Sequence, residues 1–249
     1  MADYSYIGVG KIYLRDRSNV AAGLIEIGNC SSLSFKVDEE IKEQQDFRNV
    51  GGGVLNEVRR IKGVAIDMSL EELTPANLAR ALYGSASAVS AGTVAAGDPE
   101  TVTARKGALV KLAHANPSTV VVKSEGGSIT YEAGSDKDYE VRTGGIYITP
   151  DSDIVDGSTL TVTYSYGAQN VIQALVSSSK EYELFFEGLN EARTGSPVNV
   201  EAWRCKLGAL ADLALLGSDY ASLKVTGKVL KDTTQAAGIS QYFRATIVE

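Results

Sequence analysis

Hydrophobic and polar positions alternate along a long stretch near the N-terminus, residues 33–70. The odd-numbered positions of its first part are apolar: Leu33, Phe35, Val37, Ile41 and Phe47. The even-numbered positions of the same part are polar: Ser34, Lys36, Asp38, Glu40, Lys42, Gln44, Asp46 and Arg48. Alternation returns at residues 58–70, after a run of three glycines. A period of two is typical of a strand with one buried and one wet face, so the sequence predicts a long β-hairpin with a glycine-rich tip.

A short helix is expected after this hairpin. Thr74 is a good N-cap residue, Pro75 suits the first helical position, and Gly84 ends the pattern. Leu78 and Leu82 fall on one stripe of this helix. Because so short a helix is not stable alone, we expect it to pack against a sheet.

The composition changes at residues 85–97, where Ser, Ala and Gly dominate without periodicity, as is typical of a linker. Short strands separated by glycine-containing turns are then expected at residues 108–113, 119–123, 128–132, 139–142, 146–149 and 159–166. Their spacing is that of a β-sandwich. The sequence therefore predicts an Ig-like β-sandwich, residues 95–167, inserted into a host domain.

Longer strands are expected again after Gln169, at residues 173–189, 198–207, 223–231 and 240–248, with a short turn or helix at 209–216. We expect them to complete the sheet that the N-terminal strands at residues 10–14 and 23–28 begin. The predicted fold class is mainly β, with one flanking α-helix. The host domain is discontinuous and comprises residues 1–94 and 168–249.

Composition and charge exclude several classes of protein. The chain has 249 residues, of which 44% are hydrophobic and 22% are charged, as in ordinary globular proteins. Its formal net charge of −7 disfavours a protein that grips a nucleic-acid backbone, which requires a concentrated basic surface. No apolar run approaches the roughly 20 residues of a membrane span. The first residues do not form a leader-like stretch, so we expect synthesis and use in a cytoplasm.

Residues with catalytic or metal-binding chemistry are scattered along the chain. His114 is the only histidine, and no nucleophile motif surrounds it, so a surface role is favoured over a general base. Cys30 and Cys205 lack the spacing of a zinc site; free buried thiols are favoured, and a disulfide between them is the alternative. Asp151 and Asp153 match only a fragment of a calcium loop. The sequence therefore predicts no catalytic residue, no metal site and no cofactor.

Several short motifs occur in a fixed order. They are Gly28-Asn29, the acidic hairpin with its glycine-rich tip, Pro-x-Asn-Leu-x-x-Ala-Leu-x-Gly at residues 75–84, Phe-Glu-Gly-Leu-Asn at 186–190, Trp203, and Ile-Ser-Gln-Tyr-Phe at 239–243. In this order they resemble the tail tube protein, or major tail protein, of tailed bacteriophages. The segment with Asp-Tyr-Glu-Val at 138–141 and Thr-Val-Thr-Tyr at 161–164 is similar to domains inserted in some of these proteins.

The resemblance implies a tail-tube-type β-sandwich or barrel that assembles into hexameric rings, which stack into a hollow tube for DNA ejection into the host. Its partners would be further copies of the chain and the tape measure, tail terminator and tail tip proteins, with transient passage of DNA and no membrane contact. The protein would be a structural component of the virion, assembled in the host cytoplasm. A bulky exterior domain would obstruct a contractile sheath, so a non-contractile tail is favoured. No catalytic residue comes with the family.

Two candidate sites follow from the hairpin pattern and the resemblance. The polar face of the hairpin is expected to face the lumen, with three acids against two bases: Asp38, Glu40, Lys42, Gln44, Asp46 and Arg48. The tip is expected to be mobile before assembly and to order between stacked rings: Val50, Gly51, Gly52, Gly53 and Val54.

A competing interpretation is a secreted or surface-displayed β-sandwich module that binds carbohydrate or adheres to cells. It explains the Ig-like segment, the tyrosines and the acidity, but neither the missing leader nor the long hairpin. A hydrolase on a β scaffold is a third interpretation, and the sequence offers it no nucleophile, metal set or acid pair.

Overall fold

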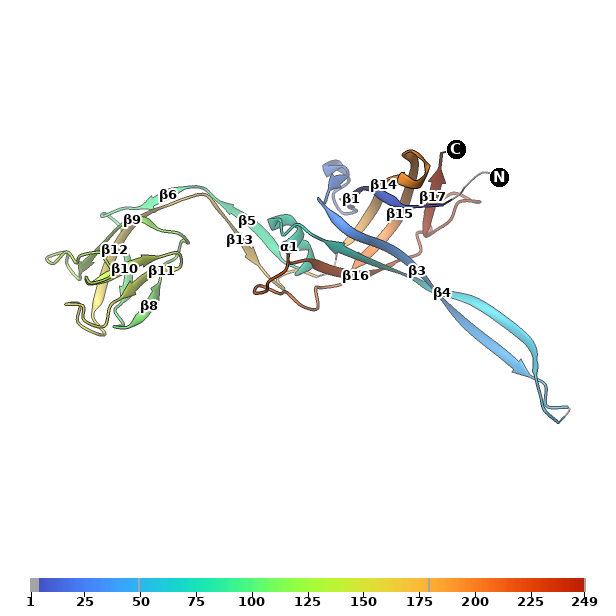
Figure 1. Ribbon diagram of the computed structural model, residues 1–249, viewed down its shortest axis with the longest axis horizontal. Coiled ribbons are helices and arrows are strands. Elements are labelled where there is room, and N and C mark those ends of the chain that lie inside the picture. Colours follow the sequence, from blue (N-terminus) through green and yellow to red (C-terminus); the bar gives the residue numbers. More distant parts are fainter. Residues whose placement is uncertain (1–4, 49, 179, 249) are drawn as a thin grey trace. The chain divides into compact units, whose positions relative to one another are not determined.

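The computed structural model describes residues 5–48, 50–178 and 180–248. Strands make up 51% of the chain and helices 5%. The chain is therefore mainly β, as the alternation of apolar and polar positions predicts. Figure 1 shows the elements in chain order.

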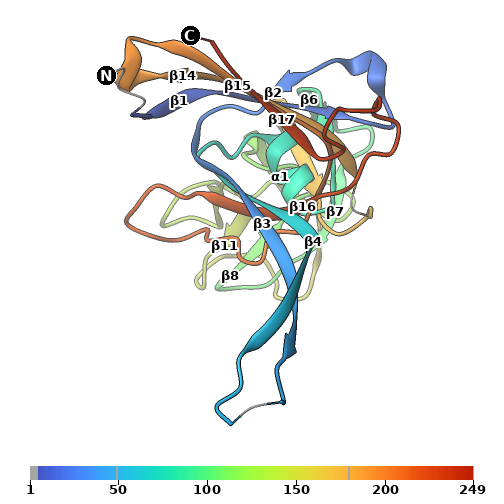
Figure 2. The same ribbon diagram turned by 90° about the vertical axis from the view of Figure 1, so that its right-hand side faces the viewer.

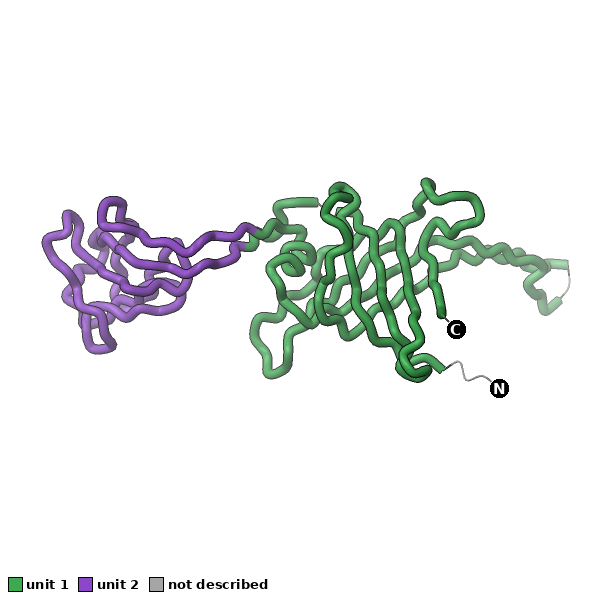
Figure 3. Tube along the Cα trace, turned by 90° about the horizontal axis from the view of Figure 1, so that it is seen from above, with its two compact units in different colours: residues 1–86, 172–249 green, residues 87–171 purple. Residues whose placement is uncertain are grey.

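The chain divides into two compact units (Figure 3). The first comprises Met1–Ala86 and Ile172–Glu249, and the second comprises Ser87–Val171. The first unit is thus discontinuous in sequence. The predicted inserted segment, residues 95–167, lies within the second unit, whose ends extend beyond it on both sides.

The prediction of a linker at residues 85–97 is wrong. This segment contains β5 (Ser85–Val89) and β6 (Gly92–Val94). β5 pairs with β13 (Gln169–Gln173), and β6 pairs with β12 (Thr159–Tyr166). Backbone hydrogen bonds to strands far along the chain hold these two strands in place. Their small residues show no alternation, so the sequence pattern does not indicate them.

One antiparallel sheet frames the first unit. Within the described residues it has eight strands in the order β2-β1-β14-β15-β16-β4-β3, with β17 paired to β15. The strands are β1 (Gly8–Asp16), β2 (Ile25–Glu26), β3 (Cys30–Gln45), β4 (Val54–Leu70), β14 (Glu181–Asn190), β15 (Ser196–Leu207), β16 (Leu223–Val229) and β17 (Phe243–Ile247). Short 3-10 helices follow β1 at Val20–Ala22 and β14 at Glu191–Arg193. Strands from before and after the insertion therefore share one sheet.

The sheet curls around its core at β15. The first half of β15 pairs with β17, whereas its last three residues pair with β16. The rings of Phe35 on β3 and Phe243 on β17 stack with their centroids 5.3 Å apart. The enclosed core takes apolar side chains from β1, β4, β14, β15, β16 and the helix, among them Ile66, Leu184 and Cys205. β1, next to one end of the sheet, and β3, at the other end, thus contribute to one core.

The predicted helix is confirmed as α1 (Pro75–Ala81). The hydroxyl of Thr74 accepts a hydrogen bond from the backbone N–H of Asn77, at 3.2 Å. The side-chain amide of Asn77 is buried and donates to the carbonyl groups of Ile27 and Glu72, at 2.8 and 3.1 Å. This amide joins the start of the helix to the segment after β2, so packing supports a helix that is too short to be stable alone.

Two other sequence predictions differ from the structure, and a third is narrowed by it. Residues 173–189 do not form one strand, because the backbone N–H groups of Leu175 and Ser177 donate to carbonyls after α1 and Leu175 has a φ of 59°. Residues 128–132 make only a bridge at Thr130, beside a turn of two glycines with positive φ. Of the turn or helix expected at residues 209–216, the helix is absent, since the chain there is an irregular loop with bends.

The second unit is built from two sheets with a core of their own. The first has the order β10-β11-β8, and the second has β12 paired with β6, β7 and β9. The remaining strands are β7 (Glu100–Thr103), β8 (Ala108–Lys111), β9 (Ser118–Ser124), β10 (Tyr139–Arg142) and β11 (Gly145–Ile148). Side chains from both sheets meet in this core, including Ile146, Leu160 and Val162. The unit is therefore a small β-sandwich, and the predicted alternation along residues 159–166 is confirmed.

Candidate self-assembly surface

The hairpin of β3 and β4 continues beyond the sheet that holds its base (Figure 2). β16 pairs with β4 only from Leu70 to Val64, while β3 and β4 pair with each other as far as Gln45 and Val54. We call residues 38–63 the arm. A two-stranded ribbon is at best marginally stable in water, so the arm gains stability from any further partner.

The outer edge of β3 is open. Within the described residues, β3 pairs with β4 on one side and with no strand on the other. The strand is 16 residues long and contains no proline. Soluble proteins usually shorten, cover or break an edge of this kind, because its free backbone groups can pair with another chain. The β3 edge can therefore accept a strand from another molecule.

The register of the arm decides which side chains share a face. It shifts after Asp38, where Lys62 is the extra residue of β4. Four of the predicted lumen-facing residues alternate along one face of β3: Asp38, Glu40, Lys42 and Gln44. Arg60 of β4 lies opposite Glu40 and adds a cation to this face. The face therefore carries two acids and two bases rather than an excess of acid.

The sequence prediction covers the polar positions of β3 alone, so it does not include the positive charge of Arg60 on β4. Its position depends on the bulge at Lys62, and the sequence pattern does not show that bulge. Both acids also have a nearby cation: the ammonium of Lys42 is 3.5 Å from Glu40, and that of Lys62, which lies at the bulge and is not counted among the two bases, is 4.0 Å from Asp38.

Asp46 and Arg48 do not continue this face. β3 ends at Gln45, and both residues lie in the tip. The carboxylate of Asp46 accepts hydrogen bonds from the backbone N–H and the guanidinium of Arg48, at 2.9 to 3.0 Å. These hydrogen bonds lower the pKa of Asp46. Such an Asx contact favours a turn. Asp46 and Arg48 therefore continue the alternation in the sequence but are not part of a strand.

The tip presents apolar side chains with little local burial. It comprises residues 46–53 without Asn49, which lies outside the described residues. Gly51 and Gly52 have φ angles of 101° and 56°, a backbone region that favours glycine. Phe47 and Val50 are almost completely exposed, and Val54, the first residue of β4, is exposed as well.

The opposite face of the arm mixes charge with exposed isoleucines. Arg59 forms ion pairs with Glu39, at 3.4 Å, and with Glu57. Ile41 and Ile61 are about half exposed on the same arm. This face of the arm therefore offers both apolar side chains and charges to a protein partner.

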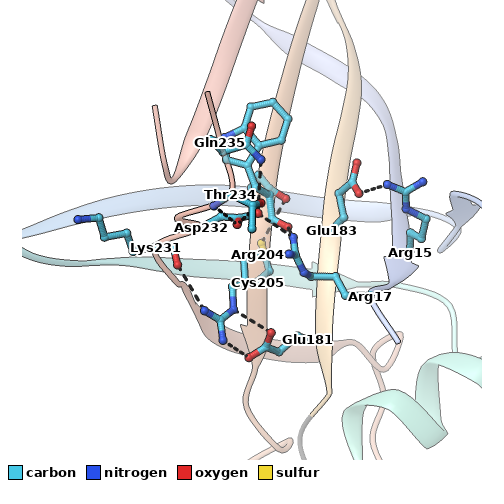
Figure 4. A network of polar contacts seen from close by, with 12 residues as sticks. Arg15, Arg17, Glu181, Glu183, Arg204, Cys205, Lys231, Asp232, Thr234 and Gln235 are labelled. Carbon is cyan, nitrogen blue, oxygen red and sulfur yellow. Dashed lines mark hydrogen bonds and ion pairs between the residues drawn. The ribbon is translucent and has the colours of Figure 1, made fainter. Parts of the chain in front are cut away.

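A polar network fastens the loop before β17 to the sheet (Figure 4). The guanidinium of Arg17 donates to the buried carboxylate of Asp232 at 3.0 Å, and the hydroxyl of Thr234 donates to the same carboxylate at 2.7 Å. Hydrogen bonds from Thr234, with those from Arg17, lower the pKa of Asp232 to about 2. Beside them Arg204 binds Glu181 through two nitrogen atoms, at 2.7 and 2.8 Å. Arg17 and Asp232 pair with each other, as do Arg204 and Glu181, which favours a structural role for this network.

The only histidine belongs to the second unit. His114 stacks on Tyr166, with ring centroids 3.6 Å apart, and its Nδ1 is 3.1 Å from the hydroxyl of Tyr164. That hydroxyl donates to Glu100. Burial, followed by this hydrogen bond, raises the pKa of Tyr164 to about 12. The cluster contains no serine or cysteine nucleophile and joins strands of the sandwich.

The two cysteines are free. Burial raises the pKa of Cys30 to about 11 and that of Cys205 to about 12, so both are poor nucleophiles at neutral pH. The described residues contain no group of three or more His, Cys, Asp or Glu side chains arranged to hold a metal ion. Among those same residues, no helix is long and apolar enough to cross a membrane.

Comparison with known protein families gives a match over nearly the whole chain. Residues 5–246 match the family described as protein of unknown function UCP028589. The match spans both units. No curated protein matches the chain.

Proposed function

The chain belongs to this family of unknown function. We propose that it is a structural protein that assembles with copies of itself into the tail tube of a tailed bacteriophage. The proposal includes hexameric rings that stack into a hollow conduit for DNA ejection. The motifs that resemble tail tube proteins support it, and so does the arm with its open edge.

The observation that carries the proposal is the unpaired length of β3. A 16-residue edge strand next to exposed apolar side chains favours association over a monomer, because free edges promote pairing between chains. In a ring, the edge of one copy would pair with a strand of its neighbour. Such pairing would continue the sheet around the ring and leave few edges exposed.

The balanced face of the arm suits a channel for DNA. A face with two acids and two bases attracts phosphate far less than a basic face would, since each unpaired cation adds a salt-dependent attraction. DNA would therefore pass without being held. In this proposal the partners are other copies of the chain and the tape measure, terminator and tip proteins of a non-contractile tail.

The second unit has a role outside the conduit in this proposal. Its core is separate from that of the first unit. We propose that it is an Ig-like domain that projects outward from the tube of the virion. No catalysis and no cofactor are needed for any part of this function.

Electron microscopy of the purified full chain in negative stain tests the proposal. We expect rings or tubes at high protein concentration, and sedimentation should show the same species growing as concentration rises. Uniform small particles of monomer size at every concentration would contradict it.

A groove in the second unit favours a different function, that of a surface module that binds carbohydrate or cells. The groove has a volume of about 680 Å³ and is lined by Tyr131 and Tyr147 together with several carboxylates, including Asp136 and Asp151. Aromatic rings next to acceptors are common in ligand sites. A monomeric protein that binds a glycan array, and loses this binding in Tyr131→Ala, would favour this function over the tube.

A further inference from the structure

The loop between β15 and β16, residues 208–222, exposes a cluster of apolar side chains. Leu215, Leu216 and Tyr220 are 76%, 97% and 101% exposed. The start of the loop is anchored, because Leu210 and Leu213 pack on the core and the backbone N–H of Leu210 donates to the last carbonyl of α1 at 2.7 Å. Exposed apolar clusters of this kind mark interaction sites.

A groove elsewhere in the first unit has matching chemistry. It lies between β1 and β3, has a volume of about 360 Å³, and has no charged residue in its lining. Its apolar walls are Ile12, Leu33, Phe35, Phe186 and Val200. Val9 also borders the groove, but its side chain lies on the other face of β1, because it alternates with Ile12. Tyrosine, glycine, cysteine and serine form the rest of the lining. Such a groove favours an uncharged, apolar occupant.

Both walls of this groove are strand edges with unused backbone groups. β1 pairs with β14 along its whole length, but it pairs with β2 only at Tyr13 and Leu14. Within the described residues, the first half of β1 therefore has a strand partner on one side alone. The facing edge of β3 is open as well. An occupant can thus supply backbone hydrogen bonds in addition to side-chain contacts.

The loop and the groove lie at opposite ends of the same strands. Gly8 pairs with Asn190 at the groove end, whereas Asp16 pairs with Tyr182 at the other end. The loop leaves β15 after Leu207, at this second end. Strands rise about 3.4 Å per residue, and the groove extends along β1 as far as Ile12, so the second half of β1 separates the anchored start of the loop from the groove of its own copy.

We propose that Leu215 and Leu216 of one copy dock into the uncharged groove between β1 and β3 of a second copy. A patch on one surface and a pocket on another surface of the same molecule give a head-to-tail contact, which closes into a ring or continues as a filament. The occupant is a second copy because every copy carries one such loop and one such groove, and neither the two leucines nor the lining of the groove is charged. This contact rests on the proposed self-assembly and names residues that make it.

Charge substitutions at two exposed positions test the contact. Tyr6 lines the groove, with its ring over Gly8, and is 54% exposed, and Leu216 is 97% exposed. Y6E and L216K should therefore fold with an unchanged thermal unfolding midpoint. Sedimentation velocity of the full chain over a concentration series measures assembly. Each single variant should assemble only at a concentration about tenfold higher or more, because a charge must be buried in an apolar groove.

The double variant Y6E/L216K should restore assembly. Lysine from one copy then meets glutamate from the next, so assembly should recover most of the loss of either single variant. V155K, which changes an exposed valine of the second unit, is the matched control and should assemble like the wild type.

The outcomes separate this contact from the proposed function. Single variants that assemble at the wild-type concentration, or a double variant no better than the worse single one, overturn the contact while leaving the self-assembly of the chain intact. A wild type that remains monomeric at every concentration overturns both.

Discussion

At the scale of single residues, Asp232 joins three parts of the first unit. Its carboxylate meets Arg17 after β1 and Thr234 in its own loop, and its backbone N–H donates to Gln241 just before β17. Asp232 is 3% exposed. A charge in such a place stabilises the fold only while its partners are present.

D232N keeps the shape of the side chain and removes the charge. We expect the free energy of unfolding at pH 7 to fall by about 1–3 kcal/mol, because Arg17 loses its ionic partner. Urea unfolding measures it. D67N, at an exposed position of β4, is the control and should change stability little.

The same carboxylate predicts a pH dependence. The folded pKa of Asp232, about 2, lies below the unfolded value near 3.9. Its stabilising contribution is therefore complete above about pH 4 and is lost as the pH falls through about 2. The wild type should lose more stability than D232N over this interval. Parallel losses in the two proteins would show that the carboxylate is not responsible.

Asn77 gives a second prediction at this scale. N77A leaves the carbonyls of Ile27 and Glu72 without their side-chain donor, and a buried unsatisfied group costs about 1–3 kcal/mol. We expect a lower thermal unfolding midpoint, measured by circular dichroism. N56A, on the exposed arm, should leave the midpoint nearly unchanged; an equal midpoint in N77A would mean that the amide does not fasten the helix.

At the scale of elements, the sequence predicts what local chemistry determines. The hairpin and α1 follow from alternation and from Thr74 and Pro75, because these signals act within a few residues. The bulge at Lys62 and the strands at residues 85–94 depend on distant partners, so their positions were not predictable. The same holds for the site: the face of β3 could be predicted as far as Gln44, whereas Arg60 could not.

The arm faces carry a prediction of their own. D38K/E40K converts the balanced face into one with four cations, and we expect assembled protein to bind double-stranded DNA at low salt and to release it as salt rises. E39K/E43K places the same charges on the other face and is the control. A filter-binding assay compares the two. Equal DNA binding by both variants would show that the face with Asp38 and Glu40 is not the one that lines a channel.

At the scale of the whole molecule, the two cores suggest that the second unit is dispensable for assembly. Replacing residues 87–171 with a short Gly/Ser linker removes the second core entirely and leaves the first intact. We expect a soluble protein that still assembles, as judged by electron microscopy. Loss of the fold of the first unit on this deletion would contradict the independence of the two cores.

The boundaries can be tested at the same time. Deleting only residues 95–167 leaves β6 without its partner β12. This variant should be less stable or less soluble than the deletion of residues 87–171. The comparison distinguishes the observed unit from the segment that the sequence predicts.

The central claim is that copies of the chain join at the open edge of the arm. Hydrogen exchange of residues 38–61, followed by mass spectrometry in the free and the assembled protein, tests it most directly. We predict fast exchange in the free protein, because a two-stranded ribbon opens readily, and strong protection after assembly. Equal exchange in both forms, in samples that contain rings or tubes, would contradict the claim.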